Sequence, residues 1–248
     1  MSEKTIVAMG GGGFSMEPQN LALDQFILGL TGKENPKVCF VPTASGDSNI
    51  YIGRFQESFE KLSCVPSHLS LFRRSGDDLR ERVLSQDVIY VGGGNTFNML
   101  TLWRAHGLDV LLREAYEQGT VMCGLSAGSL CWYEAGVTDS FGPLRELLDG
   151  LRFLPGSHCP HYDGEEHRKP TYERLVRERI LPGGVAADDG AALVYRNGQL
   201  TEVVTSRANA SAWRVMPSDD GLDITTLPTR VLPQGLFVRE EWPSIQAP

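Results

Sequence analysis

The sequence predicts an α/β fold with a mostly parallel central sheet and helices on both faces. Short apolar runs alternate with longer amphipathic segments through the first half of the chain, which is typical of strands and helices in turn. The chain has 248 residues, enough to bury roughly three quarters of its unfolded surface in one core. We therefore expect a single domain over residues 1–248, with a core of about 5–205 and a β-rich extension over 206–248.

The predicted elements follow one another in a regular order. The apolar runs that predict buried strands are 5–9, 37–42, 68–72, 87–91 and 120–123. Apolar residues at helical spacing predict helices over 21–30, 51–62, 77–84, 95–103, 108–118 and 165–180. Asn95 is the expected N-cap of its helix. Asn197 and Gly198, between the apolar runs 192–195 and 200–204, predict a β-hairpin.

Composition excludes several classes of protein. The 23 Lys and Arg against 31 Asp and Glu give a net charge of −8, so binding to nucleic acid is not expected, because phosphates require a basic surface. No apolar stretch is long enough for a membrane span, and residues 1–9 lack the layout of a signal peptide. The five cysteines share no C-x-x-C spacing, so we expect a reduced, cytoplasmic protein.

The strongest local motif is residues 124–128, GLSAG, directly after the predicted strand 120–123. A Gly-x-Ser-x-Gly sequence between a strand and a helix is the pattern of a nucleophile elbow, which presents its serine at the edge of a sheet. The helix that follows directs its N-terminal N–H groups toward the serine, where they can hold an oxyanion. An ordinary tight turn is the alternative interpretation.

Two further segments carry groups that can bind a ligand or take part in catalysis. Residues 91–97, VGGGNTF, also follow a strand, and their glycines allow backbone N–H groups to approach a bound oxygen. Neither this run nor Gly10–Gly13 has the pattern of a nucleotide-binding loop. Residues 157–167, SHCPHYDGEEH, contain three histidines in a loop that lacks a typical zinc-binding spacing. With a serine at the same sheet edge, one of these histidines is a candidate general base.

Three of these segments together resemble the peptidase E family, which comprises α-aspartyl dipeptidases and the related cyanophycinases. They are residues 92–97 (GGGNTF), 124–128 (GLSAG) and 160–163 (PHYD), in the family's order and spacing. The resemblance implies a fold like that of class I glutamine amidotransferases, with serine in place of the amidotransferase cysteine. It also implies hydrolysis of peptides that begin with aspartate.

The resemblance assigns roles to particular residues. Ser126 matches the family's nucleophile and His161 its general base, while Gly94 and Ala127 match the positions whose N–H groups form the oxyanion hole. The acid is left open, because the family's Asp lies fifteen residues after the serine, where this chain has Phe141. Asp139 and Glu134 are nearly equal candidates.

Asp163 is the third candidate for the acid, at the amidotransferase spacing. For the substrate, Arg168 is a candidate partner of an aspartate side chain, because Arg binds carboxylates with two hydrogen bonds. Asp188 and Asp189 are candidates for the α-ammonium group, and Asn95 is a further candidate substrate-binding residue.

The sequence therefore predicts a serine dipeptidase that requires no metal and no cofactor. We expect small peptides as its substrates, no membrane partner, and a monomer or homodimer. Two alternatives stay open: an esterase or amidase acting on another small substrate, and a non-catalytic binding or regulatory protein of the same fold. A glutamine amidotransferase is disfavoured, because thioester chemistry requires a thiolate.

Overall fold

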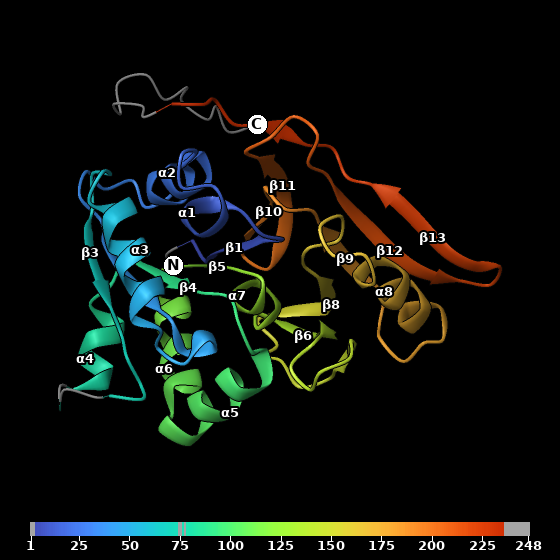
Figure 1. The fold of residues 1–248 in the computed structure, drawn as a ribbon, viewed down its shortest axis with the longest axis horizontal. Coiled ribbons are helices and arrows are strands. Elements are labelled where there is room, and N and C mark those ends of the chain that lie inside the picture. Colours follow the sequence, from blue (N-terminus) through green and yellow to red (C-terminus); the bar gives the residue numbers. More distant parts are fainter. Residues whose placement is uncertain (1–2, 74–75, 77, 236–248) are drawn as a thin grey trace.

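The computed structural model describes residues 3–73, 76 and 78–235, whose strands form two sheets (Figure 1). The first has the order β14-β11-β10-β1-β5-β4-β2-β3 and the second the order β13-β12-β9-β8-β6-β7. The first sheet comprises β1 (Thr5–Met9), β2 (Lys37–Val41), β3 (Val65–His68), β4 (Val88–Val91), β5 (Val121–Leu125), β10 (Ala191–Arg196), β11 (Gln199–Thr205) and β14 (Arg230–Val231). The second comprises β6 (Tyr133–Thr138), β7 (Arg145–Leu147), β8 (Leu154–Cys159), β9 (Gly184–Ala187), β12 (Ala212–Ser218) and β13 (Gly221–Thr226).

The first sheet is parallel at its centre. Strands β1, β5, β4, β2 and β3 pair in parallel, as the strand–helix alternation predicts, whereas β10 pairs antiparallel with β1 and with β11. The mixed α/β class is thus confirmed. The hairpin predicted at Asn197 and Gly198 joins β10 to β11, and both residues have positive φ (51° and 81°), as a type I′ turn requires.

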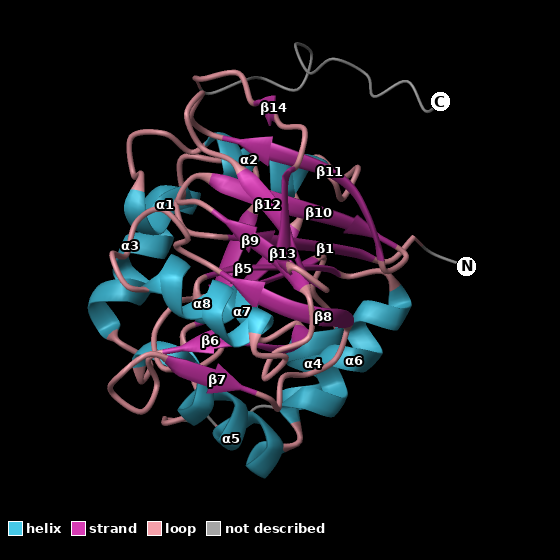
Figure 2. Cartoon of the chain, turned by 90° about the vertical axis from the view of Figure 1, so that its right-hand side faces the viewer, coloured by secondary structure: helices cyan, strands magenta, loops and turns pink. Residues whose placement is uncertain are grey.

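Helices cover both faces of this sheet (Figure 2). The helices are α1 (Gly13–Met16), α2 (Ala22–Gly29), α3 (Asn49–Phe59), α4 (Leu79–Leu84), α5 (Thr96–His106), α6 (Leu108–Gln118), α7 (Ala127–Leu130) and α8 (Arg168–Arg177). Successive residues of β1 point to opposite faces: Val7 packs with α2 and α3, and Ile6 with α5 and α6. The inner parallel strands β1, β4 and β5 are buried on both faces, so their residues are almost all apolar.

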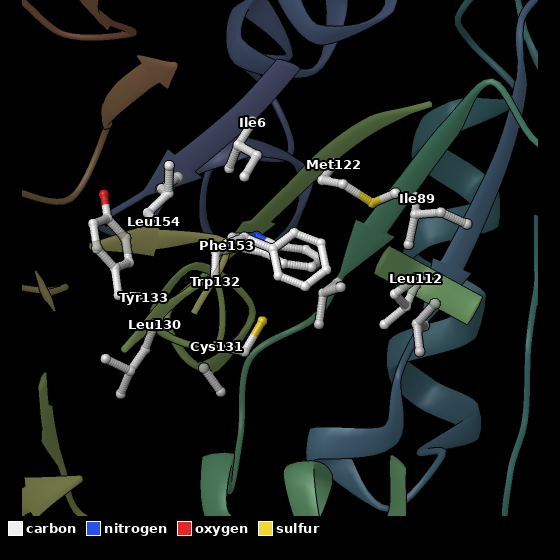
Figure 3. Packing of buried hydrophobic residues seen from close by; sticks show 14 of the residues in the cluster. Ile6, Ile89, Leu112, Met122, Leu130, Cys131, Trp132, Tyr133, Phe153 and Leu154 are labelled. Atoms are coloured by element: carbon white, nitrogen blue, oxygen red, sulfur yellow. The ribbon is translucent and has the colours of Figure 1, made fainter. Parts of the chain in front are cut away.

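The second sheet packs against one face of the first sheet. Trp132 and Phe153, at the starts of its strands, pack against each other with ring centroids 5.3 Å apart. They lie among Ile6, Ile89 and Met122 of the first sheet, in the apolar cluster drawn in Figure 3. Helix α8 packs on the second sheet through a separate apolar cluster. The sequence analysis did not predict a second sheet, and this arrangement places the end of β8 near the ends of β1 and β5.

The expected boundary at residue 205 does not coincide with a break in strand pairing. Strand β12 pairs with β9, and β14 pairs with β11, so both sheets contain strands from the proposed extension. Residues 236–248 of that extension lie outside the described part of the chain. Two other boundaries also differ: β3 ends at His68, where the sequence predicts a strand to begin, and α8 begins at Arg168 rather than at Glu165.

Within the described ranges, none of the helices combines the length and the apolar character needed to cross a bilayer.

The buried carboxyl of Asp24 gives a prediction for stability. Asp24 is 0% exposed, and the Tyr90 hydroxyl donates to its Oδ1 atom at 3.0 Å. Burial raises the pKa of Asp24 from 3.8 to about 7. Between these values the folded chain keeps a proton that the unfolded chain has lost, so this residue's contribution to stability falls as pH rises from about 4 to 7.

Replacement of Asp24 with Asn is expected to remove this part of the pH dependence. Urea unfolding at several pH values should show the stability of the variant rising relative to wild type up to about pH 7 and levelling off above it. Parallel stability curves for the two proteins would show that Asp24 does not titrate in this range.

Candidate active site

Ser126 occupies the strand–turn–helix position that the GLSAG motif predicts, between β5 and α7. Its backbone has φ 55° and ψ −118°, a conformation rare for a residue with a side chain. Its N–H donates to the Met9 carbonyl at 3.3 Å. A Cβ atom at Gly128 would lie 2.2 Å from the Val91 carbonyl oxygen, and one at Gly124 would lie 2.4 Å from that of Gly128. The motif needs both glycines because the turn packs directly on its own backbone and on β4.

The glycine run after β4 lies beside this turn. A Cβ atom on Gly93 would be 3.2 Å from the Ser126 Cβ. Gly94 has φ 136°, and a Cβ there would lie 2.2 Å from the Ala44 carbonyl oxygen, so only glycine fits this position. Among the described residues, neither the Gly94 N–H nor the Ala127 N–H has a protein acceptor. Both groups are therefore available to a ligand.

Asn95 uses its side chain within the protein. Its Oδ1 accepts from the Asn98 N–H at 2.8 Å, which confirms the predicted N-cap. Its Nδ2 donates to the Ser140 carbonyl at 2.9 Å. The residue thus fixes the start of α5 to the loop after β6, and both polar atoms of its side chain are engaged within the protein.

His161 follows the end of β8, with φ 53°, and its ring is paired with a carboxylate. The Nδ1 atom lies 2.5 Å from Asp189 Oδ1, and the two side chains are 11% and 15% exposed. Asp189 lies in the turn from β9 to β10, 28 residues after His161. The two meet because β8 and β9 are neighbouring parallel strands, whose carboxyl ends lie at the same sheet edge.

The end of β1 brings the serine and this pair together. Met9 accepts the hydrogen bond from Ser126, and Gly11 forms a parallel bridge with Asp189. A Cβ atom at Gly11 would lie 2.0 Å from Asp189 Oδ1 and 2.9 Å from His161 Cε1. The glycine run after β1, to which the sequence analysis gave no role, therefore provides the space for the His161–Asp189 pair.

The charges around Asp189 keep it ionised. Burial alone would raise its pKa, but the hydrogen bond and charge of His161, with the positive charges of Arg207 and Arg168, hold the pKa below its usual value. An ionised Asp189 accepts a hydrogen bond from Nδ1–H of His161, and the tautomer with its proton on Nδ1 has Nε2 as an acceptor.

The carboxylate that contacts His161 is Asp189, which is none of the three acids that the sequence favoured. Asp139 has a side chain that is 59% exposed and lies 4.0 Å from Arg168, and Glu134 lies within β6. Asp163 accepts from the Asp189 N–H at 2.9 Å, so it supports the turn that carries Asp189. Spacing from the serine could not identify Asp189, because its position depends on which strands are neighbours.

Arg168 is present in this region but already paired. It is 3% exposed, and its Nε and Nη2 atoms lie 2.8 and 2.7 Å from Glu165 Oε2. Its Nη1 donates to the Val137 carbonyl at 3.4 Å. A substrate carboxylate would therefore have to replace Glu165 on this guanidinium.

Asp188 is also occupied within the protein. It is 3% exposed, and its Oδ2 accepts from the Ser211 N–H at 2.9 Å. Burial raises the pKa of its carboxyl to about 7. In the part of the chain that the structure describes, no group of three or more His, Cys, Asp and Glu side chains is arranged to hold a metal ion.

Comparison with known proteins identifies the family to which this site belongs. The profile described as peptidase family S51 matches residues 6–203. The chain belongs to peptidase family S51. It is 56% identical to the "Uncharacterized peptidase YgaJ" of Bacillus subtilis over 229 residues, covering 92% of this chain and 99% of that protein. It is 28% identical to "Peptidase E" of Shewanella denitrificans, with 74% of this chain and 80% of that protein covered.

The fold of this S51 chain is similar to solved structures. A peptidase from an acI-B1 Actinobacterium superposes with a TM-score of 0.66, at 17% identity, covering 94% of this chain and 97% of that one. Membership of S51 supports a peptidase activity, and the predicted resemblance to the peptidase E family is confirmed.

Proposed function

We propose that the chain is a serine peptidase that hydrolyses small peptides, chiefly dipeptides with N-terminal aspartate, through an acyl-enzyme on Ser126. The observation that carries the proposal is the convergence of Ser126 and the His161–Asp189 pair at the end of β1. Membership of a peptidase family supports the same reaction.

The mechanism follows from the hydrogen bonds of His161. Its Nδ1–H donates to ionised Asp189, so Nε2 can take the proton of Ser126 as the serine oxygen attacks the scissile carbonyl. Asp189 then stabilises the imidazolium that forms. His161 returns the proton to the leaving amine, and water, activated by the same ring, hydrolyses the acyl-enzyme.

The unpaired N–H groups of Gly94 and Ala127 are the proposed oxyanion hole. The backbone around them is closely packed, because Gly94 and Gly128 leave no room for a Cβ atom beside the Ala44 and Val91 carbonyl groups. Fixed donors of this kind stabilise the tetrahedral intermediate by about 3 kcal/mol each.

The contact of Asp189 with His161 favours a catalytic over a non-catalytic protein, because it gives His161 the carboxylate partner that a general base requires. No feature of the site favours an ester over a peptide. Cytoplasmic location and a monomeric or homodimeric state stay predictions of the sequence.

A substrate panel tests the proposed specificity. We expect the wild-type protein to hydrolyse Asp-Leu far faster than Asn-Leu, its uncharged isostere, because only Asp-Leu has a carboxylate that can replace Glu165 on the Arg168 guanidinium. Glu-Leu, Ala-Leu and a p-nitrophenyl ester complete the panel. Equal rates for Asp-Leu and Asn-Leu would contradict aspartate specificity, and faster cleavage of the ester alone would favour an esterase.

A further inference from the structure

A fully buried line of polar groups lies beneath the turn that carries Ser126. The Ser129 hydroxyl is 2.9 Å from the Ser126 carbonyl oxygen and 3.1 Å from His158 Nε2. The other ring nitrogen, His158 Nδ1, is 3.2 Å from the Val185 carbonyl oxygen. Ser129 and His158 are both 0% exposed. The line connects α7, β8 and β9, and the mechanism above uses neither side chain.

The donors and acceptors along this line can be assigned. A carbonyl oxygen only accepts, so Nδ1 of His158 carries the proton that points at Val185. Burial lowers the pKa of His158 to about 3, so the ring is neutral and its Nε2 atom accepts. The Ser129 hydroxyl is thus the donor, and its single proton is shared between the Ser126 carbonyl oxygen and His158 Nε2 in a three-centre hydrogen bond.

His158 is itself fixed in place. Its ring stacks on Tyr133, with centroids 4.6 Å apart and an interplanar angle of 14°. The Tyr133 hydroxyl donates to that of Tyr195 at 2.9 Å. Strands β6, β9 and β10 therefore hold the ring that locates the Ser129 hydroxyl.

The carbonyl of Ser126 and the N–H of Ala127 belong to one peptide unit. In a planar trans peptide these groups point in opposite directions, so a donor that fixes the carbonyl also fixes the direction of the N–H. Hydrogen bonds in a chain polarise one another, so donation to the carbonyl also makes the N–H a stronger donor. The Ser126 carbonyl also accepts from the N–H groups of Ser129 (3.0 Å) and Leu130 (2.9 Å).

We propose that Ser129, located by His158, is a positioning residue that orients and polarises the Ser126–Ala127 peptide for oxyanion binding. This inference rests on the proposed function, since it assigns Ala127 N–H to the oxyanion hole. The hydrogen bonds from Val185 through His158 and Ser129 thereby connect the buried interior of the second sheet to the peptide unit beside the nucleophile.

Replacement of Ser129 with Ala removes the hydroxyl and leaves Ser126, His161 and Asp189 in place. We expect kcat for Asp-Leu to fall by about tenfold, the effect of one hydrogen bond realised in the transition state. KM should stay within about twofold. The second-order rate of reaction with a fluorophosphonate should fall in parallel, because its phosphonyl oxygen occupies the same hole.

Ser157 provides a matched control on β8. Its hydroxyl is buried and contacts the Tyr172 hydroxyl at 2.8 Å and the Pro182 carbonyl at 2.6 Å, without touching the Ser126 turn. Ser157→Ala should lower thermal stability without changing kcat. If Ser129→Ala does not fold, Ser129→Cys, nearly the same size but a weak donor, should show the same fall in kcat.

A double-mutant cycle isolates the role of His158. His158→Phe keeps a ring over Tyr133 but removes both nitrogens, and in a Ser129→Ala background it should lower kcat no further. Wild-type kcat and phosphonylation rate in the folded Ser129 variant would overturn the inference, as would an equal loss in Ser157→Ala or additive losses in the cycle. A different result would contradict the proposed function: hydrolysis of Asp-Leu by the Ser126→Ala protein, or no hydrolysis by the wild type. In that case the inference about Ser129 fails as well, because it rests on that function.

Discussion

The Ser126→Ala protein is expected to lose peptide hydrolysis while it keeps its fold. Removal of the nucleophile of a serine peptidase lowers kcat by roughly 10⁶-fold. Among the residues that the structure describes, the hydroxyl makes no hydrogen bond on which the turn depends, because the contacts that hold the turn come from the backbone of Ser126. Release of free aspartate from Asp-Leu measures the activity, and thermal unfolding measures the fold. Ser67→Ala on β3, away from the site, should keep wild-type turnover.

Retained turnover in the Ser126 variant would require another nucleophile. The cysteines near the site residues in sequence are poor candidates: Cys123, Cys131 and Cys159 are fully buried, and burial raises the pKa of all three thiols well above the usual range. None of them forms a thiolate near neutral pH. Such a result would therefore contradict the mechanism itself, and not only the choice of nucleophile.

The Asp189→Asn protein is expected to bind substrate but to turn it over about 10⁴-fold more slowly. An amide at this position can donate to Nδ1 of His161, which stabilises the tautomer that carries its proton on Nε2. That tautomer cannot accept the proton of Ser126. The measurement is kcat for Asp-Leu near neutral pH, where the lowered pKa of Asp189 keeps the wild-type carboxyl ionised.

The two carboxylates favoured by the sequence serve as controls for Asp189. Asp139→Asn and Glu134→Gln should each keep kcat within about twofold of wild type, as substitutions outside a catalytic contact do. A large loss in either variant, together with normal turnover in Asp189→Asn, would show that the acid in the working enzyme is a different residue.

The first half of the fold could be predicted because its signals are local. Strands β1, β2, β4 and β5 are continuous apolar runs buried on both faces, and the helices between them carry regular apolar spacing. The second sheet gave weaker signals. Strand β8 contains proline and glycine, and β9 has four small residues. Neither sequence is typical of a strand, so these strands of the second sheet are recognisable only when their neighbours are known.

The candidate site could likewise be predicted only in part. Ser126 and His161 lie in motifs that are contiguous in sequence, and the structure places both at the end of β1. Asp189 could not be found from spacing, because its contact with His161 depends on the parallel pairing of β8 and β9. One signal was available: Asp188 and Asp189 directly follow an apolar run at a strand end and precede a glycine.

The most direct test of Ser126 as the nucleophile is to map the adduct of the wild-type protein with a fluorophosphonate by peptide mass spectrometry. We expect one adduct, on the peptide that contains Ser126, with stoichiometric loss of Asp-Leu hydrolysis and much slower labelling of the Asp189→Asn protein. Loss of activity through an adduct on another residue, or full activity in protein labelled at Ser126, would contradict the proposed mechanism.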